Sequence, residues 1–504
     1  MSSRPAYDAL ATHHARIYNL EHLQAMASWD SMTFMAPSAA PARGAAQAEL
    51  NSIIHRLQND PSIDDLIAQA QAEPLDESQA ANLEAMRRQQ RIARAIPDQL
   101  ASQRELLVAA ASEAWHGARK ANDWDNFATA LKPLVALVRQ EADHLGQALG
   151  LSRYDALLER WEPGLRVARV ADLFGDVSLW LPELVNQTIE RQRSWAFIEP
   201  QGPFDAGQQK QVCERVMAAL GFDFSAGRLD TSAHPFSGGV PEDVRLTTRF
   251  SEANALPSLL ATVHETGHAL YQQNLPREWL GQPLAGPHSA ALHEGQALTY
   301  ERQLAPTPAF VAVLARELSA SFGPQPAFVP NNIAQLIRRV RRGKIRVEAD
   351  ELTYPAHVIL RVEIEQKLIA GEIEVDDIPA IWDARMAALL QLDTKGDFAN
   401  GPLQDIHWSR GMFGYFPAYL LGAMVAAQLF EHFTAESNDF EARAQAGDFA
   451  SLGDWLREKV WHQGGRYTLE DLVVRATGCP LSAESLRAHL TRRYLYEEPG
   501  HGRH

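Results

Sequence analysis

The sequence Leu256–Leu270 reads LPSLLATVHETGHAL and contains the pattern His264-Glu-Thr-Gly-His268. One face of a predicted helix is formed by residues three or four positions apart: Leu256, Leu260, Val263, Gly267 and Leu270. His264 and His268 lie one turn apart on this helix, so both imidazoles reach one side, as two ligands of a tetrahedral zinc do. Glu265 projects beside that metal, where it can take a proton from the attacking water. Gly267 costs helix stability, about 1 kcal/mol relative to Ala, so we expect another segment to approach closely there.

A catalytic zinc site usually has a third protein ligand, and a second predicted helix, 290–301, offers candidates. Glu294 follows His268 by 26 residues, which is enough for a loop and an antiparallel return. His293, Glu294 and Glu301 all compete for the ligand role. Glu294 and Glu301 are seven residues apart and share a helix face, whereas His293 points about 100° away. The spacing therefore favours the glutamate face without choosing the residue.

The composition narrows the classes of function. The chain has 504 residues, of which 46% are hydrophobic and 22% charged, as in an average globular protein. Its net charge of -16 repels phosphate backbones, so we expect no nucleic-acid partner. The only cysteines, Cys213 and Cys479, exclude a disulfide framework and a cysteine-rich zinc site. A metal must therefore be held by nitrogen and oxygen ligands.

The apolar segments do not indicate a membrane protein. No apolar run reaches the roughly 18–20 residues that a membrane span needs. The longest candidate, 420–430, is predicted to be a buried helix. The first 23 residues lack the apolar core of a signal peptide. We therefore expect no membrane partner and a cytoplasmic location.

The rest of the chain predicts a mainly α protein. Helical periodicity recurs over about 8–195 and 330–490, with neither a clear repeat nor a long linker. Residues 243–250 instead alternate with period two, which predicts a strand, preceded by the turn-rich run 236–241. We expect one large helical body with a substrate groove and a small β-sheet beside the zinc helix. A single domain, 1–504, would have an N-terminal helical part (about 1–195), a catalytic part (about 230–430) and C-terminal helices (about 431–504).

Six short motifs give the chain a specific resemblance. In order they are His234-Pro-Phe236, Asp243-Val-Arg-Leu-Thr247, His264-Glu-Thr-Gly-His268, His293-Glu-Gly-Gln296, Ile345-Arg-Val-Glu-Ala-Asp350 and Gly401-Pro-Leu-Gln-Asp-Ile-His-Trp408. In these motifs the sequence resembles the carboxypeptidase Taq family of zinc metallocarboxypeptidases, the M32 peptidases. The fourth motif of that family more often reads His-Glu-Ser-Gln followed by a serine and an arginine. This chain has Gly295, Ala297 and Leu298 at those positions. It therefore has no arginine side chain to perform whatever role that residue has in the family.

The resemblance implies metal ligands at His264, His268 and Glu294, with Glu265 as general acid and base. It also implies a zinc cofactor, a deep substrate groove, a homodimer and a mostly helical fold with a small sheet. The reaction would remove C-terminal residues from peptides with a free C-terminus and a broad range of side chains. A site of two histidines and one carboxylate also accepts cobalt or manganese.

A carboxypeptidase must bind a free carboxylate, and an arginine guanidinium forms a bidentate pair with one. Arg346 is our first candidate, and Arg245 and Arg249 on the predicted strand come next. Arg346 ends a basic run that would attract carboxylates in an otherwise acidic chain. Stabilising the developing oxyanion needs a further donor. The candidates for it are His407, Tyr415 and Tyr419.

Other motif residues have two interpretations each. His234 either donates a hydrogen bond at the zinc site or fixes the loop before Pro235. Asp350 and Asp405 either support the ligand histidines or cap helices. The strand 243–250 is either the edge along which an extended peptide lies or a structural hairpin.

Two alternatives to a carboxypeptidase stay open on the sequence. The pattern His-Glu-x-x-His alone also fits an endopeptidase or an aminopeptidase. From another class, the chain could be a catalytically inactive helical protein that binds a metal or a peptide. The intact Glu265 argues against the second alternative, because a structural zinc needs no such carboxylate.

Overall fold

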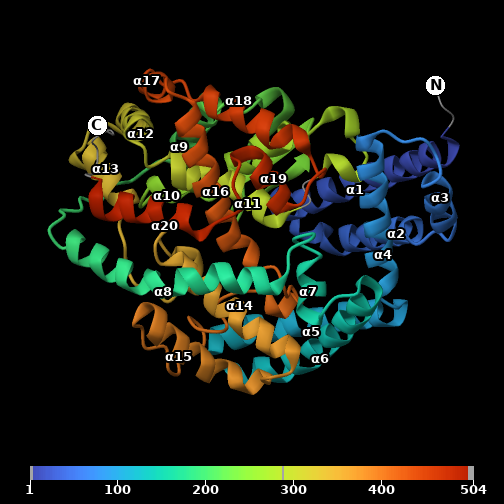
Figure 1. The fold of residues 1–504 in the computed structure, drawn as a ribbon. Coiled ribbons are helices and arrows are strands. Elements are labelled where there is room, and N and C mark those ends of the chain that lie inside the picture. Colours follow the sequence, from blue (N-terminus) through green and yellow to red (C-terminus); the bar gives the residue numbers. More distant parts are fainter. Residues whose placement is uncertain (1–3, 287–288, 498–504) are drawn as a thin grey trace.

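The computed structural model describes residues 4–286 and 289–497. The N-terminal helices form a lobe at the right of Figure 1: α1 (Pro5–Thr33), α2 (Ala40–Gln58), α3 (Ser62–Ala70) and α4 (Glu77–Ala95). This lobe has a small core of its own, which includes Leu10, Ile63 and Met86. Asp76 caps α4 through a reciprocal capping box with Gln79. The lobe contacts the main body through α1, which packs against a strand, and α4.

A lower tier in Figure 1 contains the helices α5 (Asp98–Ala121), α6 (Trp124–Leu149), α7 (Arg153–Leu158), α8 (Val167–Gln192), α14 (Tyr354–Ala370) and α15 (Ile378–Leu390). Their apolar faces point inward, and α14 contacts α6, α7, α8 and α15. Gly150 ends α6 in a left-handed conformation, which glycine adopts without a steric penalty. The tier therefore joins segments that lie far apart in the sequence.

The upper tier contains the predicted helix of the His264-Glu-Thr-Gly-His268 motif. Its helices are α9 (Ala206–Ala219), α10 (Leu256–Gln273), α11 (Ala290–Leu298), α12 (Pro308–Phe322), α13 (Pro330–Ile337), α16 (Pro417–Glu436), α17 (Phe440–Gln445), α18 (Ala450–Lys459), α19 (Leu469–Thr477) and α20 (Ala483–Thr491). α11 continues as a π-helical segment, Thr299–Leu304, and lies between α10 and α16. The apolar run 420–430 forms the buried core of α16, as predicted. Among the described residues, no helix is both long and apolar enough to span a bilayer.

A three-stranded sheet lies beside α10. Its strands are β1 (Gly227–Thr231), β2 (Ser237–Val240) and β3 (Asp243–Thr248), in the order β1-β3-β2. β3 confirms the predicted strand, but it is the middle strand and cannot be the free edge that we considered for a peptide. The run 236–241, which we expected to be a turn, instead forms β2, because β3 gives its backbone an antiparallel partner. β2 is thus an edge of the sheet beside α10.

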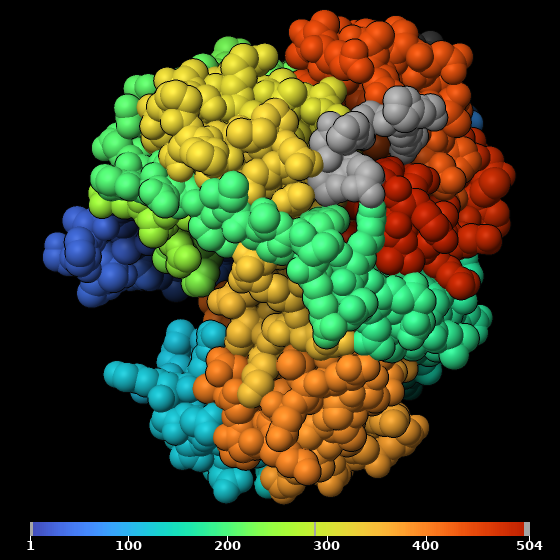
Figure 2. All heavy atoms as spheres, turned by 90° about the vertical axis from the view of Figure 1, so that its left-hand side faces the viewer, coloured from blue at the N-terminus to red at the C-terminus, as the bar shows by residue number. Residues whose placement is uncertain are grey.

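The structure confirms a mainly helical fold with a small sheet. One continuous hydrophobic core extends through both tiers, from Ala111 in α5 to Tyr494 near the C-terminus. Figure 2 shows a deep hollow between the N-terminal helices in blue and the cyan segment below them. The cavity described next opens between the two tiers, because α10, α11 and α14 all contribute to its walls.

Candidate metal centre

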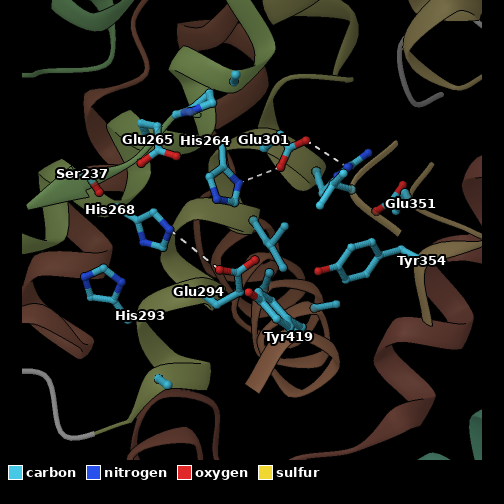
Figure 3. Close-up of a pocket in the computed structure, with 18 of the residues that line it drawn as sticks. Ser237, His264, Glu265, His268, His293, Glu294, Glu301, Glu351, Tyr354 and Tyr419 are labelled. Atoms are coloured by element: carbon cyan, nitrogen blue, oxygen red, sulfur yellow. Dashed lines mark hydrogen bonds and ion pairs between the residues drawn. The ribbon is translucent and has the colours of Figure 1, made fainter. Parts of the chain in front are cut away.

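Two histidines and one glutamate meet on facing helices. His264 and His268 of α10 and Glu294 of α11 each offer one ligand atom, and these atoms lie within 4.8 Å of one another. Nε2 of His268 is 3.8 Å from a carboxylate oxygen of Glu294. The two imidazole rings are 4.9 Å apart and nearly perpendicular, so they converge without stacking. Figure 3 shows the three side chains pointing toward a common centre.

Close helix packing brings these side chains together. A Cβ atom at Gly267 would lie 2.6 Å from Cα of Ala297 in α11, which confirms the close approach expected at this glycine. On the opposite side of α11, a Cβ at Gly422 of α16 would lie 2.9 Å from Cβ of Glu294. α11 is therefore held between two glycine contacts, and these fix how far Glu294 stands from the histidines.

Glu301 holds the ring of His264. Its Oε2 accepts a hydrogen bond from Nδ1 of His264 at 2.8 Å, and its Oε1 pairs with Arg302 at 3.0 Å. When the ring is neutral, this hydrogen bond keeps the proton on Nδ1 and leaves the lone pair on Nε2, the nitrogen that can bind a metal. Spacing alone could not separate Glu294 from Glu301. The π-helical segment, which starts at Thr299, changes the helix register between them.

His293, the third candidate ligand, packs against His268 instead. The two rings are stacked with centroids 4.4 Å apart and an angle of 23°. Burial lowers the pKa of His293 to about 4, so its ring is neutral. In Figure 3 it lies on the far side of His268 from Glu294.

The three side chains fit a divalent cation. Burial lowers the pKa of His268 well below its usual value, and His293 and His264 act in the same direction. Burial also raises the pKa of Glu294. Burial alone would lower the pKa of His264, but Glu301 and Glu294 raise it to about 9. Two imidazoles and a carboxylate in a buried cluster are a donor set that suits zinc, and a cation there would favour the ionised form of Glu294.

Glu265 lies beside this cluster and is only 7% exposed. Burial raises its pKa to about 7, against the opposing effects of His264 and of a hydrogen bond from Ser237. Ser237 starts the edge strand β2 and lines the same cavity. No sequence pattern singles out Ser237, because it lies in a run that predicts a turn.

A cavity of about 920 Å³ contains the cluster, and its walls include three of the predicted substrate residues: Arg346, Tyr415 and Tyr419. Arg346 donates to Asp405 from Nε and Nη2 and to the Tyr354 hydroxyl from Nη1, at 2.6 to 3.2 Å. Its guanidinium also lies 4.7 Å from the ring centre of Tyr419. Arg346 is thus a fixed cation in the cavity wall.

Other predicted residues have partners elsewhere. His407 is behind the wall, with Nε2 at 3.2 Å from the hydroxyl of Tyr419. Arg245 pairs with Asp243 on its own strand at 2.6 Å. His234 is exposed on the loop before β2, and its carbonyl accepts a hydrogen bond from Ser232. This contact uses the backbone of His234 and not its imidazole.

The two aspartates proposed beside the ligand histidines also occupy other positions. Asp350 accepts backbone hydrogen bonds from Arg341, Leu352 and Thr353, so it caps the turn before α14. Asp405 pairs with both Arg346 and Arg361. Both aspartates are therefore bound to other partners. The carboxylate that contacts the ligand His264 is that of Glu301.

Four further cavity residues went unnoticed in the sequence: Arg160, Arg302, Glu351 and Tyr354. Glu351 pairs with His489 at 2.8 Å and with Arg493 at 2.9 Å, so its carboxylate is part of a buried charged network. Glu351 directly follows the fifth motif, which could have indicated it. Arg160 lies in no motif, so only the fold reveals it.

The comparisons with known proteins agree with this geometry. The model of the carboxypeptidase Taq (M32) metallopeptidases matches residues 9–494. Thermostable carboxypeptidase 1 of Thermus thermophilus is 33% identical, with 98% of this chain and 99% of the relative covered. Carboxypeptidase 1 of Bacillus subtilis is 31% identical, with 95% and 96% covered. Among solved structures, Trypanosoma cruzi metallocarboxypeptidase 1 has a TM-score of 0.96 at 41% identity, covering 98% of this chain and all of that one. A Pyrococcus furiosus carboxypeptidase has a TM-score of 0.93 at 30% identity, covering 98% and 99%.

Proposed function

Because the chain belongs to the carboxypeptidase Taq (M32) family of metallopeptidases, we propose that it is a zinc carboxypeptidase of broad specificity. It would remove C-terminal residues from peptides that have a free carboxylate. The observation that carries this proposal is the convergence of His264, His268 and Glu294 next to Glu265 inside one large cavity.

The donor set supports zinc as the cofactor. Nε2 of each histidine and a carboxylate oxygen of Glu294 would hold it, leaving room for substrate, as in catalytic zinc sites. Cobalt and manganese share these ligand preferences. When bound, such a cation supplies Lewis-acid polarisation of the scissile carbonyl and of water.

Glu265 is the proposed general base. It takes a proton from water during attack on the scissile carbonyl and then donates it to the leaving amine. A pKa raised to about 7 by burial suits both transfers near neutral pH, because neither protonation state is strongly disfavoured. Ser237 keeps the carboxylate oriented through its hydrogen bond.

Arg346 is the proposed anchor for the substrate carboxylate. Two arginines, Arg346 and Arg361, share the single carboxylate of Asp405, so one positive charge is left at this wall of the cavity. Tyr415 and Tyr419 line the same wall and offer hydroxyl groups to the oxyanion. His407 would act indirectly, by orienting Tyr419.

The edge strand β2 supports broad specificity. Its first residue, Ser237, lines the cavity near Glu265, so an extended peptide can lie beside this edge. Backbone hydrogen bonds to a strand edge do not depend on the side chains of the peptide. The peptide-binding edge considered for strand 243–250 would thus be β2 and not β3, because β3 is paired with a strand on each side.

Replacing Glu265 by Gln tests the proposal. We expect the variant to retain about one metal ion per chain and to lose hydrolysis by several orders of magnitude, because the amide cannot accept the proton. Metal analysis and a peptide assay on the same sample measure the two properties. Retained hydrolysis would refute the role of Glu265, and a wild-type protein without activity would favour a binding protein.

We also infer a cytoplasmic homodimer with no nucleic-acid partner. Resemblance to the family supports the dimer, and the net charge of -16 supports the absence of nucleic-acid binding. Light scattering coupled to size exclusion measures the first property. A monomer mass of 55.9 kDa at micromolar concentration would contradict the dimer.

A further inference from the structure

The segment Glu159–Glu162 joins the N-terminal lobe to the metal centre. Trp161 accepts a hydrogen bond at its carbonyl from Ala290 N at 3.0 Å. The carboxylate of Glu162 accepts from the Ser289 hydroxyl at 2.6 Å and from Ala291 N. These hydrogen bonds bind the segment to the first turn of α11, the helix that carries Glu294. The segment is therefore fixed relative to the metal ligands.

Every side chain of this segment except Arg160 has a polar partner. Glu159 pairs with Arg88 at 3.1 Å and with Arg166 at 2.8 Å. Nε1 of Trp161 donates to the carbonyl of Phe413 at 3.2 Å. Among residues 4–286 and 289–497, no hydrogen bond or ion pair holds the guanidinium of Arg160. Arg160 is exposed, so its five donors face solvent and are free to bind a ligand.

Arg160 lies where two cavities meet. It lines the 920 Å³ cavity of the metal centre and a second cavity of about 570 Å³ between the N-terminal lobe and the end of α10. Its side chain is open to these cavities, yet burial by the surrounding protein lowers its pKa; Arg104 acts in the same direction and the carboxylate of Glu141 opposes both. Five donors in a partly desolvated groove would bind a carboxylate more strongly than they would at an open surface.

Within the part of the chain that the structure describes, the charged groups near Arg160 form no ion pair with its guanidinium. Glu141 is bound by Arg104 at 2.6 Å. In the second cavity Arg88 is committed to Glu159, and burial lowers the pKa of His14 to about 4, so it is neutral. Glu21 also lines this cavity and accepts a hydrogen bond from Gln58, an uncharged amide, so among the described residues it pairs with neither Arg160 nor another cation there.

The position of Arg160 indicates which part of a peptide would reach it. Figure 3 shows Tyr354 and Glu351 on one side of the ligand cluster and His293 on the other. Arg160 belongs to the side of His293, because Trp161 and Glu162 bind the first turn of α11. A carboxypeptidase holds one residue beyond the scissile bond and all others before it. With the substrate carboxylate near Arg346, the earlier residues extend past Arg160 toward the second cavity.

We propose that Arg160 binds the side-chain carboxylate of an Asp or Glu located before the scissile bond, and so selects acidic peptides. This inference rests on the proposed carboxypeptidase function, which sets the direction of the peptide. A bidentate pair with a guanidinium is the strongest contact that such a side chain can make in the groove.

Matched peptides test the proposal. Each pair has the same alanine-rich sequence and free C-terminus, with Glu or Gln at one of the positions two to six residues from the end. For wild type we expect kcat/KM to be about 10-fold higher for Glu than for Gln at one of these positions, since a charge-assisted hydrogen bond is worth about that ratio. The ratio should decline as salt is raised, because the pair is partly screened.

Substitutions at Arg160 then assign the preference. In Arg160→Ala the ratio should drop to about one, and Arg160→Lys should keep only part of it, because a point charge lacks the planar fork. Arg160→Glu should instead favour a Lys peptide over its Gln partner. Arg193→Ala is the matched control, because it removes an exposed arginine paired with Glu190 on α8 and should leave the ratio unchanged.

Binding measurements separate this inference from the proposed function. The dissociation constants of the same peptides in the Glu265→Gln background give the Glu-to-Gln ratio without turnover. If C-terminally amidated peptides are trimmed as fast as free acids, the carboxypeptidase proposal fails, whatever the ratio. If the ratio is near one at every position, or equal in wild type and Arg160→Ala, the role of Arg160 is refuted.

Discussion

Replacing Gly267 by Ala should disturb the metal centre without touching any ligand. The added Cβ would lie 2.6 Å from Cα of Ala297 and 2.8 Å from the carbonyl oxygen of Gln296. Both atoms belong to the backbone of α11, so no side-chain rotation relieves the contact. An ordinary contact needs about 3.5–4.0 Å, so α10 and α11 must separate by about 1 Å.

The expected size of the effect follows from this displacement. Overpacking of this kind costs about 1–3 kcal/mol, while the change from Gly to Ala in a helix returns about 0.5–1 kcal/mol. We therefore expect the free energy of unfolding of the metal-free protein to fall by about 1–2 kcal/mol. Ligand distances tolerate only about 0.2 Å, so metal affinity should decrease by on the order of 10- to 100-fold.

The assay combines a metal titration against a competing chelator with urea unfolding of the metal-free protein. Gly175→Ala is the matched control, because Gly175 lies inside α8 and a Cβ there would meet no atom within 4 Å. That control should keep its metal affinity and gain about 0.5–1 kcal/mol. If Gly267→Ala behaves like the control in both measurements, helix contact does not set the ligand geometry.

The remaining predictions concern the carboxylates around the site. Glu301→Gln should weaken metal binding about 10- to 100-fold, because its carboxylate accepts the Nδ1 proton of His264; an unchanged titration would contradict this. Glu294→Ala should lose more metal affinity than His293→Ala, and the reverse order would overturn the ligand set. Burial raises the pKa of Glu162 from 4.5 to about 8, so between these values the folded chain keeps a proton that the unfolded chain releases, and stability falls as pH rises. Glu162→Gln should remove this fall, of up to about 1.4 kcal/mol per pH unit, in urea unfolding at pH 5 and 8; equal slopes in both proteins would refute it.

The sequence predicted what local spacing determines. His264, Glu265 and His268 are separated by at most four residues, so helix geometry alone brings them to one side. The apolar run 420–430 and the alternating strand 243–250, observed as β3 over 243–248, were predicted for the same reason. Arg346 was predicted because it lies in a motif and ends a basic run in an otherwise acidic chain. The structure places it in the cavity wall.

The rest depends on contacts between distant segments. A regular helix places Glu294 and Glu301 on one face, and only the π-helical segment gives them separate tasks. Asp405 was interpreted either as a partner of the ligand histidines or as a helix cap, but two arginines from other segments hold it. Arg160 lies in no sequence motif. Its proposed role depends on the lack of an ion-pair partner for its guanidinium among the described residues, which only the fold reveals.

One measurement tests the central claim most directly. Peptides that differ only in a free or an amidated C-terminus are digested by the wild-type protein with zinc, and the products are identified by mass spectrometry, with and without a chelator. We predict stepwise loss of C-terminal residues from the free acids alone, abolished by the chelator. Equal trimming of the amides, internal cleavage, or activity that survives complete metal removal would contradict the assignment as a metallocarboxypeptidase.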